Sequence, residues 1–138
     1  MEISEVSEIL GLCYFLKAPQ HVFITEERVS SQHNGVTYYR GLQPKSKGDS
    51  IFLTADMDKS SPIHETIHAS IGFGEPGTEV LTRLIMRKNK LAQNFPRIAG
   101  FFTKKLEYEQ VQESGEYPSA HKPKFQGRVK HFILRSVT

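Results

Sequence analysis

The stretch SPIHETIHASIGFGEPGTEV, residues 61–80, places two histidines four residues apart on what reads as one helix. Ser61 is a favourable N-cap residue, and Pro62 suits a first helical turn because its missing N–H group is not needed there. Isoleucine recurs every four residues from Ile63 to Ile71 and forms an apolar stripe. The glycines that follow are expected to end the helix after about three turns.

His64 and His68 are the candidate metal ligands. Residues four apart on a helix project from the same face, so these two imidazoles can present nitrogen atoms to one divalent ion. Glu65 lies one step around the helix, where it can reach an attacking water without binding the metal. A bound metal lowers the pKa of water, and Glu65 is therefore predicted to be the general base. The alternative is an ordinary helix with two core histidines and a solvated glutamate.

A zinc site also needs a third protein ligand, and two carboxylates follow the histidines. Glu79 is the favoured candidate because it opens the next predicted helix, on the side away from that helix's Leu/Ile stripe. Glu75 is the alternative, and it lies in the glycine- and proline-rich turn before that helix. Two imidazoles and one carboxylate suit a single zinc ion, although this ligand set does not exclude other divalent metals.

The remaining pattern predicts a small α+β domain. An amphipathic helix is predicted over residues 3–17, and the short β-rich runs after it predict a twisted sheet of three to four strands. Two more helices are predicted after the histidine helix, over about 79–92 and 97–113. The predicted strands are residues 21–25, 36–42 and 50–56, with a last one in RVKHFILRSV (128–137).

Composition is ordinary for a globular protein. The chain has 138 residues, 38% of them hydrophobic and 24% charged, which is enough for one domain with its own core. No apolar run approaches the roughly 20 residues that span a bilayer, and the acidic start MEISEVSEIL lacks the positive charge of a secretory signal. The single cysteine, Cys13, is expected to be a small buried hydrophobe. We therefore expect a cytoplasmic protein with no membrane partner.

Basic residues concentrate towards the C-terminus. Residues 114–138 contain five basic residues and one acidic residue, and they are predicted to form a basic tail that packs on or extends from a domain over residues 1–113. Such a tail can contact nucleic acid or an acidic partner. The alternative is a solvated strand or arm, since no aromatic-rich RNA motif and no cysteine-pair finger accompanies it.

Over residues 50–85 the sequence resembles the zincin metallopeptidases, and within them the gluzincins, in which HExxH is completed by a downstream glutamate. SIFLTAD resembles the strand beside the cleft, IHETIHA the active-site helix and TEVLTRLI the glutamate helix. The layout is similar to very small zincin-like proteins, including those of phages, plasmids and archaea. The resemblance implies zinc binding by His64, His68 and Glu79. It also implies that Glu65 is the general base and that an extended peptide pairs with the upper strand.

Two features depart from the larger gluzincins. The gap between His68 and Glu79 is short, and Arg83 stands where many of them carry an acidic residue four positions after the ligand glutamate. No further glycine and histidine extend the motif, which disfavours the metzincin branch.

Supporting residues are less sharply specified. Asp56 and Asp58 are candidates to hold the outer ring nitrogens of the histidines. An oxyanion also needs a stabilising group besides the metal. The candidates, each of which can equally be a surface or packing residue, are Tyr117, His121, His131 and Arg83.

These observations lead to three hypotheses. The first is a zinc-dependent metallopeptidase that hydrolyses a peptide or protein substrate by metal-activated water, with Glu65 as general base. The second is a non-catalytic zinc-binding protein. The third is a module that binds nucleic acid or a protein partner through the basic tail. In a variant of the third, the tail folds across the cleft and brings His121 or His131 to the metal.

Overall fold

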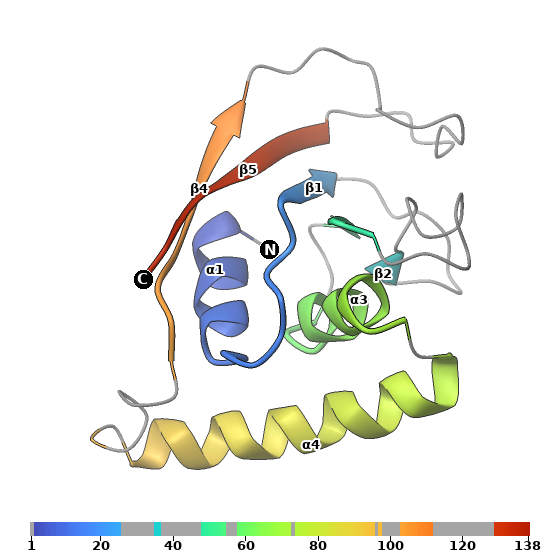
Figure 1. The fold of residues 1–138 in the computed structure, drawn as a ribbon, viewed down its shortest axis with the longest axis vertical. Helices are drawn as coiled ribbons and strands as arrows, with labels where there is room; N and C mark the ends of the chain where they lie inside the picture. The colour runs from blue at the N-terminus through green and yellow to red at the C-terminus, as the bar shows by residue number, and fades with distance from the viewer. Residues whose placement is uncertain are drawn as a thin grey trace.

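Helices and strands are assembled around one mixed sheet in the computed structural model (Figure 1). The structure describes residues 2–25, 35–36, 48–54, 58–72, 74–95, 97, 103–111 and 129–138. The elements in chain order are α1 (Ile3–Gly11), β1 (His21–Thr25), β2 (Gly35–Val36), β3 (Ser50–Thr54), α3 (Ser61–Ser70), α4 (Glu75–Asn94), β4 (Leu106–Val111) and β5 (Val129–Val137). The expected α+β class is therefore confirmed.

The sheet has five strands in the order β2-β3-β1-β5-β4, which is one more than the sequence predicted. β1 and β3 are parallel, with Phe23 opposite Phe52, and every other neighbouring pair is antiparallel. The last strand, β5, lies between β1 and β4. The strand predicted near the C-terminus is thus confirmed, and it is a central member of the sheet.

One face of the sheet supplies most residues of the main core cluster. Alternate residues of β1 and β3 point to this face, which α1 and α3 cover (Figure 1). The buried residues of this cluster are Val6, Leu10, Val22, Ile24, Ile51, Leu53, Ala69, Leu106 and Phe132. The intervening residues Phe23 and Phe52 project to the other face, where their rings stack at 5.9 Å between centroids. Both faces of the central strands are therefore apolar.

A second core cluster joins α3 to α4. Ile63 and Ile67 of the predicted apolar stripe are fully buried, and they pack with Cys13, Leu16 and Ile85. α3 thus lies between the sheet and α4, as Figure 1 shows. His64 and His68 each follow one of these isoleucines, so they lie on the adjoining side of α3.

α1 is shorter than the predicted helix over residues 3–17. It ends at Gly11, and turns follow in which the Cys13 N–H donates to the Leu10 carbonyl and the Leu16 N–H to the Cys13 carbonyl. Cys13 and Leu16 are nevertheless buried, as their spacing predicted. Burial raises the pKa of the Cys13 thiol, which is consistent with its expected role as a small apolar residue.

The prediction of a helix over residues 97–113 is wrong. Residues 106–111 form β4, which pairs with β5 along its whole length. The segment LEYEQV alternates between residues that face the core, such as Leu106 and Tyr108, and exposed glutamates. This two-residue period is that of a strand, and the open edge of β5 provides the hydrogen-bond partner that stabilises it.

The other strand predictions are met in part. Residues 21–25 form β1 as predicted, and the strand predicted over 50–56 is described from Ser50 to Thr54. Of the strand predicted over 36–42, only Val36 lies within the described residues. Within the described part of the chain, no helix combines the length and apolar character that crossing a bilayer requires.

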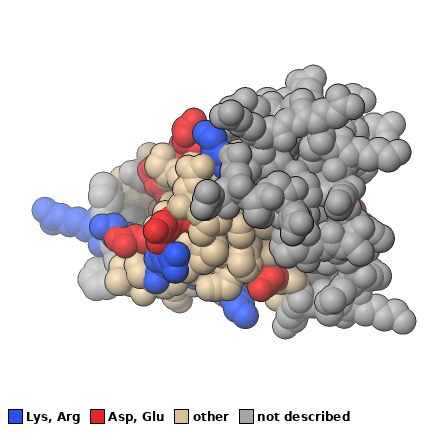
Figure 2. All heavy atoms as spheres, turned by 90° about the horizontal axis from the view of Figure 1, so that it is seen from above, with Lys and Arg blue, Asp and Glu red and all other residues tan. Residues whose placement is uncertain are grey.

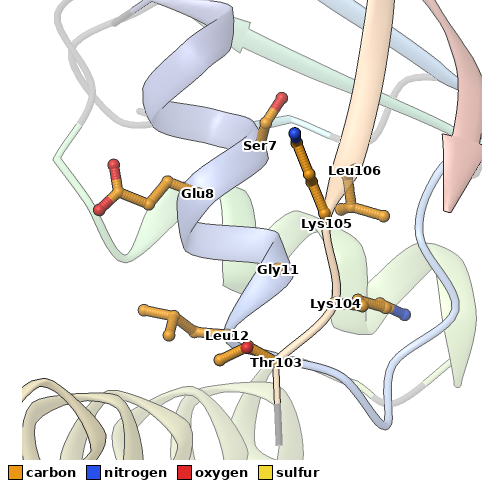
Figure 3. Close-up of a pocket in the computed structure, with 8 residues that line it drawn as sticks. All are labelled: Ser7, Glu8, Gly11, Leu12, Thr103, Lys104, Lys105 and Leu106. Atoms are coloured by element: carbon orange, nitrogen blue, oxygen red, sulfur yellow. The ribbon is translucent and has the colours of Figure 1, made fainter. Parts of the chain in front are cut away.

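A groove separates α1 from the segment that leads into β4 (Figure 3). Glu8 and Lys105 lie on opposite sides of α1 in this view, so the charged groups that line the groove do not converge on one point. At its lower end the Lys104 N–H donates to the Gly11 carbonyl at 2.9 Å. This close backbone approach leaves no room for a side chain at Gly11, because an added Cβ would overlap the Lys104 carbonyl oxygen.

Replacement of Gly11 by alanine is therefore expected to destabilise the protein. Alanine gains about 0.5–1 kcal/mol over glycine in a helix, but displacement of the Lys104 backbone costs about 1–3 kcal/mol. Urea denaturation followed by circular dichroism should show a lower free energy of unfolding for Gly11→Ala.

Gly74→Ala is the matched control for this prediction, because a Cβ added at Gly74 meets nothing within 4 Å. If Gly11→Ala is as stable as wild type, the described contact between α1 and the Lys104 backbone does not form.

Candidate metal centre

α3 places His64 and His68 side by side on its face towards α4. Their Nε2 atoms are 3.1 Å apart, and the ring planes cross at 72°. The side chains are largely sheltered, with 17% and 13% of their surfaces exposed. At this separation only one Nε2 can carry the shared proton, so at least one imidazole presents a lone pair.

The first turn of α4 brings Glu75 to the same two nitrogens. One carboxylate oxygen of Glu75 lies 2.7 Å from Nε2 of His68, and the other lies 3.3 Å from Nε2 of His64. Ligand atoms of the three side chains all lie within 4.8 Å of one another. Ligand atoms at about 2.0–2.1 Å from a tetrahedral ion are about 3.3 Å apart, so these three side chains could hold a metal ion.

Glu75 reaches this position because α4 begins earlier than predicted. The Pro-Gly pair at residues 76 and 77 was predicted to form a turn, but both residues lie in the first turn of α4, after Gly74 as N-cap. Proline is well tolerated there. α3 ends at Ser70, and Gly72, just after the C-cap Ile71, has a positive φ of 88° that is accessible to glycine and reverses the chain sharply. Glu75 is therefore held on a helix and not in a loop.

Two further residues of α4 contact the outer nitrogens of the histidines. Oε1 of Glu79 lies 3.0 Å from Nδ1 of His64, and Oγ1 of Thr78 lies 3.4 Å from Nδ1 of His68. A carboxylate oxygen can only accept a hydrogen bond, so Glu79 favours the tautomer in which His64 carries its proton on Nδ1 and donates it. Nε2 of His64 is then free to act as a ligand.

Glu79 and Glu75 thus lie at different nitrogens. Glu79, which the sequence favoured as third ligand, contacts Nδ1, whereas Glu75, the sequence's alternative, faces both Nε2 atoms. This arrangement favours Glu75 as the ligand and Glu79 as the residue that orients His64. Thr78 was not identified from the sequence. A helix start at residue 75 would have placed it, with Glu79, one turn beyond Glu75 on the same face.

Glu65 follows His64 on α3 and is 2% exposed. It is therefore a carboxylate held inside the protein beside a candidate ligand, and not the solvated glutamate of the alternative interpretation. Burial of a carboxylate is costly and is more common at functional sites than on ordinary helices.

Asp58 was predicted to hold an outer ring nitrogen of a histidine, but in the structure it contacts Ser60 and Ser61. Oδ1 of Asp58 accepts hydrogen bonds from the backbone N–H groups of Ser60 and Ser61 and from both hydroxyls. These bonds, led by that from the Ser60 hydroxyl, lower the pKa of Asp58. Asp58 therefore fixes the start of α3, while Asp56 lies outside the described residues.

Of the four oxyanion candidates, two lie outside the described residues, namely Tyr117 and His121. Arg83 is 84% exposed, and its Nε lies 4.0 Å from the Glu79 carboxylate. His131 lies on β5, where its Nε2 is 2.9 Å from Nδ1 of His21 and its ring stacks on Phe23. Burial of the His131 ring lowers its pKa, and the neighbouring His21 lowers it further. Within the described part of the chain, its contacts are with the sheet.

No family model, curated protein or solved structure matches this chain. The resemblance to zincins therefore remains a resemblance over a short motif.

Asp58 is expected to make the stability of the protein depend on pH. Its folded pKa is lower than its ordinary value of 3.8, so its contribution to stability is complete above that value and is lost as pH falls through the folded pKa. Asp58→Ala should lower the free energy of unfolding by about 1 kcal/mol at neutral pH, as loss of a helix cap does. Denaturant unfolding at several pH values should show the difference from wild type disappear in acid. An unchanged difference in acid would contradict this role.

Measurements of zinc affinity can distinguish the role of Glu75 from that of Glu79. Glu75→Gln should weaken zinc binding by more than about 100-fold, whereas Glu79→Gln, which replaces the charged acceptor of the His64 Nδ1–H group by a neutral amide, should weaken it by about 10–100-fold. Competition with a chromogenic chelator measures both, and His64→Ala gives the value for a lost ligand. If Glu79→Gln has the larger effect, Glu79 is the third ligand.

Proposed function

We propose that this protein is a small zinc-dependent metallopeptidase. The observation that carries the proposal is the convergence of the Nε2 atoms of His64 and His68, 3.1 Å apart, on the Glu75 carboxylate. Two imidazoles and a carboxylate are a common donor set of catalytic zinc sites, which use three protein ligands. Within the described residues the candidate metal group likewise has three members.

Each residue has a distinct role in this proposal. His64, His68 and Glu75 would hold the ion, while Glu79 and Thr78 orient the imidazoles through their Nδ1 atoms. A bound zinc supplies a Lewis acid that lowers the pKa of water and polarises a carbonyl.

Glu65 would accept a proton from the attacking water and donate it to the leaving amine. Glu65 directly follows His64 on α3, which is the position of the general base in an HExxH motif. Its burial excludes bulk water from the carboxylate, which strengthens its interaction with a reacting group.

The sheet offers a surface for an extended substrate. α3 packs against β3 and β2, and β2 is the outermost described strand on that side. A peptide that added its backbone to this side would run beside the candidate metal centre, and main-chain pairing would bind it with little dependence on sequence.

A non-catalytic zinc site is the second candidate, and the position of Glu79 favours it. Its carboxylate already lies 3.0 Å from His64, so a rotation of this half-exposed side chain can make it a fourth ligand. Structural zinc sites are normally closed by four protein ligands. The number of protein ligands on bound zinc, measured by X-ray absorption, distinguishes the two candidates.

Binding through the basic tail receives less support. Two of its five basic residues, Lys130 and Arg135, lie on β5 inside the sheet, and Arg135 pairs with Glu109 of β4. On the face seen in Figure 2, acidic and basic side chains of the described residues lie beside one another in small groups. Neither sign of charge forms a continuous patch among them.

Glu65→Gln tests the catalytic proposal. The variant should bind about one zinc ion per chain but cleave an internally quenched peptide library about 10²–10⁴-fold more slowly, because it cannot accept the proton. Metal analysis and fluorescence measure the two properties on the same preparation.

Glu8→Gln, a change to an exposed glutamate of α1, is the matched control. Circular dichroism confirms that each variant is folded. Undiminished cleavage by Glu65→Gln would exclude Glu65 as the base, and a wild-type protein that binds zinc without cleaving any peptide would favour the non-catalytic candidate.

A further inference from the structure

The outer face of α4 exposes a line of large apolar side chains, here called the outer stripe. Each member is more than half exposed, whereas most apolar residues of the other helices are buried. The members are Val80 (61% exposed), Leu84 (55%), Leu91 (60%) and Phe95 (56%), at the C-terminal cap. The line spans about 22 Å along the helix. Exposed apolar surface of this extent and regularity usually marks an interaction site.

The spacing of the outer stripe is that of a seam between two helices. Val80, Leu84 and Leu91 are separated by four and seven residues, and Arg87 fills the intervening seam position. A seam of this kind is narrower than the broad apolar face with which a helix enters a membrane surface. The pattern therefore favours a helical partner over a lipid surface.

The charges beside the outer stripe are mostly basic, and the one acidic neighbour at its N-terminal end, Glu79, lies 4.0 Å from Arg83. From residue 81 to residue 94, α4 carries Arg83, Arg87, Lys88 and Lys90 and no acidic residue. Lys88 lies 5.1 Å and 4.9 Å from the ring centres of Tyr14 and Phe15. These two rings are each nearly half exposed and extend the apolar surface sideways from α4. A complementary partner must therefore combine an apolar seam with acidic flanks.

A second copy of this chain is a poor occupant. An antiparallel two-fold pairing of α4 would match the apolar residues end to end, but its centre would lie between Arg87 and Lys88. Arg87 of each copy would then face Lys88 of the other, and like charges at close range oppose association. An acidic residue at that central position removes the conflict.

We infer that the outer stripe is a docking site for an acidic amphipathic helix of a partner protein. Apolar residues of the partner pack on Val80, Leu84, Leu91 and Phe95, and its central acidic residue pairs with Arg87. The mode is that of a helix laid along an apolar seam, with charge pairs setting its orientation. The inference is separate from the proposed zinc chemistry, and its test needs no metal.

The probe is a synthetic helical peptide of about three heptads, with leucine at the seam, glutamate at the flanks and one glutamate at the central seam position. The matched peptide replaces every glutamate by lysine. Fluorescence anisotropy should show that the wild-type protein binds the acidic peptide, more weakly as salt is added, and does not bind the lysine peptide.

Variants of α4 locate the site. Leu84→Gln combined with Leu91→Gln should weaken binding of the acidic peptide by at least about tenfold, while Val137→Gln, at a half-exposed apolar residue of β5, should leave it unchanged. Arg87→Glu should weaken binding of the acidic peptide and strengthen binding of a version with lysine at the central position.

Several results would overturn the inference. Equal binding of the acidic and lysine peptides, or full binding by the double variant, would exclude this site. A dimer in analytical ultracentrifugation that the double variant abolishes would assign the stripe to self-association. Binding to vesicles of phosphatidylcholine and phosphatidylserine, without binding to the acidic peptide, would assign it to a membrane surface.

Discussion

The packing of α4 against α3 through Ile63, Ile67 and Ile85 determines where the polar groups of the candidate centre lie. Each of these side chains is 2% exposed or less, and burial of an isoleucine contributes about 1.5–3 kcal/mol relative to exposure. That contribution offsets the cost of gathering carboxylates and imidazoles at one end of the helix pair. The positive end of the α4 dipole also favours an acidic residue in its first turn, which is where Glu75 stands.

α3 and α4 supply different groups of the candidate metal centre. α3 supplies the two Nε2 atoms and the buried Glu65, whereas the first turn of α4 supplies a carboxylate to Nε2 and a hydrogen-bond partner to each Nδ1. All of these groups are carried by helices, so their relative positions depend on one helix–helix contact and not on loop conformations. Beyond its first turn, α4 carries a different surface, with apolar and basic residues facing outwards.

The sequence predicted the parts of the fold that local pattern decides. The stripe from Ile63 to Ile71 and the N-terminal signals of α3 located that helix to within one residue of its start. The two glutamates were both identified, but their roles depended on whether the residues around Pro76 form a turn or a helical start. Proline and glycine are compatible with either. The deciding factor is the docking of α4 on α3, which no local pattern contains.

The short α1 and the wrong prediction of a helix over residues 97–113 have the same kind of cause. α1 ends at Gly11 where the backbone of Lys104 approaches it, and β4 forms because an edge of β5 is there to pair with it. In both cases the partner lies far along the chain, so a helical spacing of apolar residues was overridden by a distant contact. Cys13 and Leu16 are buried as their spacing predicted, whereas Val80, Leu84 and Leu91 of the predicted stripe over 79–92 are exposed, since burial and secondary structure are separate consequences of one pattern.

The position of β5 has a consequence for how this chain reaches its native state. β1 pairs on one side with β5, so that His21 stands opposite Ile133. The sheet therefore cannot close during synthesis until β5, which lies about 110 residues after β1, has left the ribosome, and until then β1 presents an open apolar edge. Long-range pairing of this kind slows folding and exposes such edges to aggregation. Pairing of β5 with β1 and β4 therefore completes the sheet.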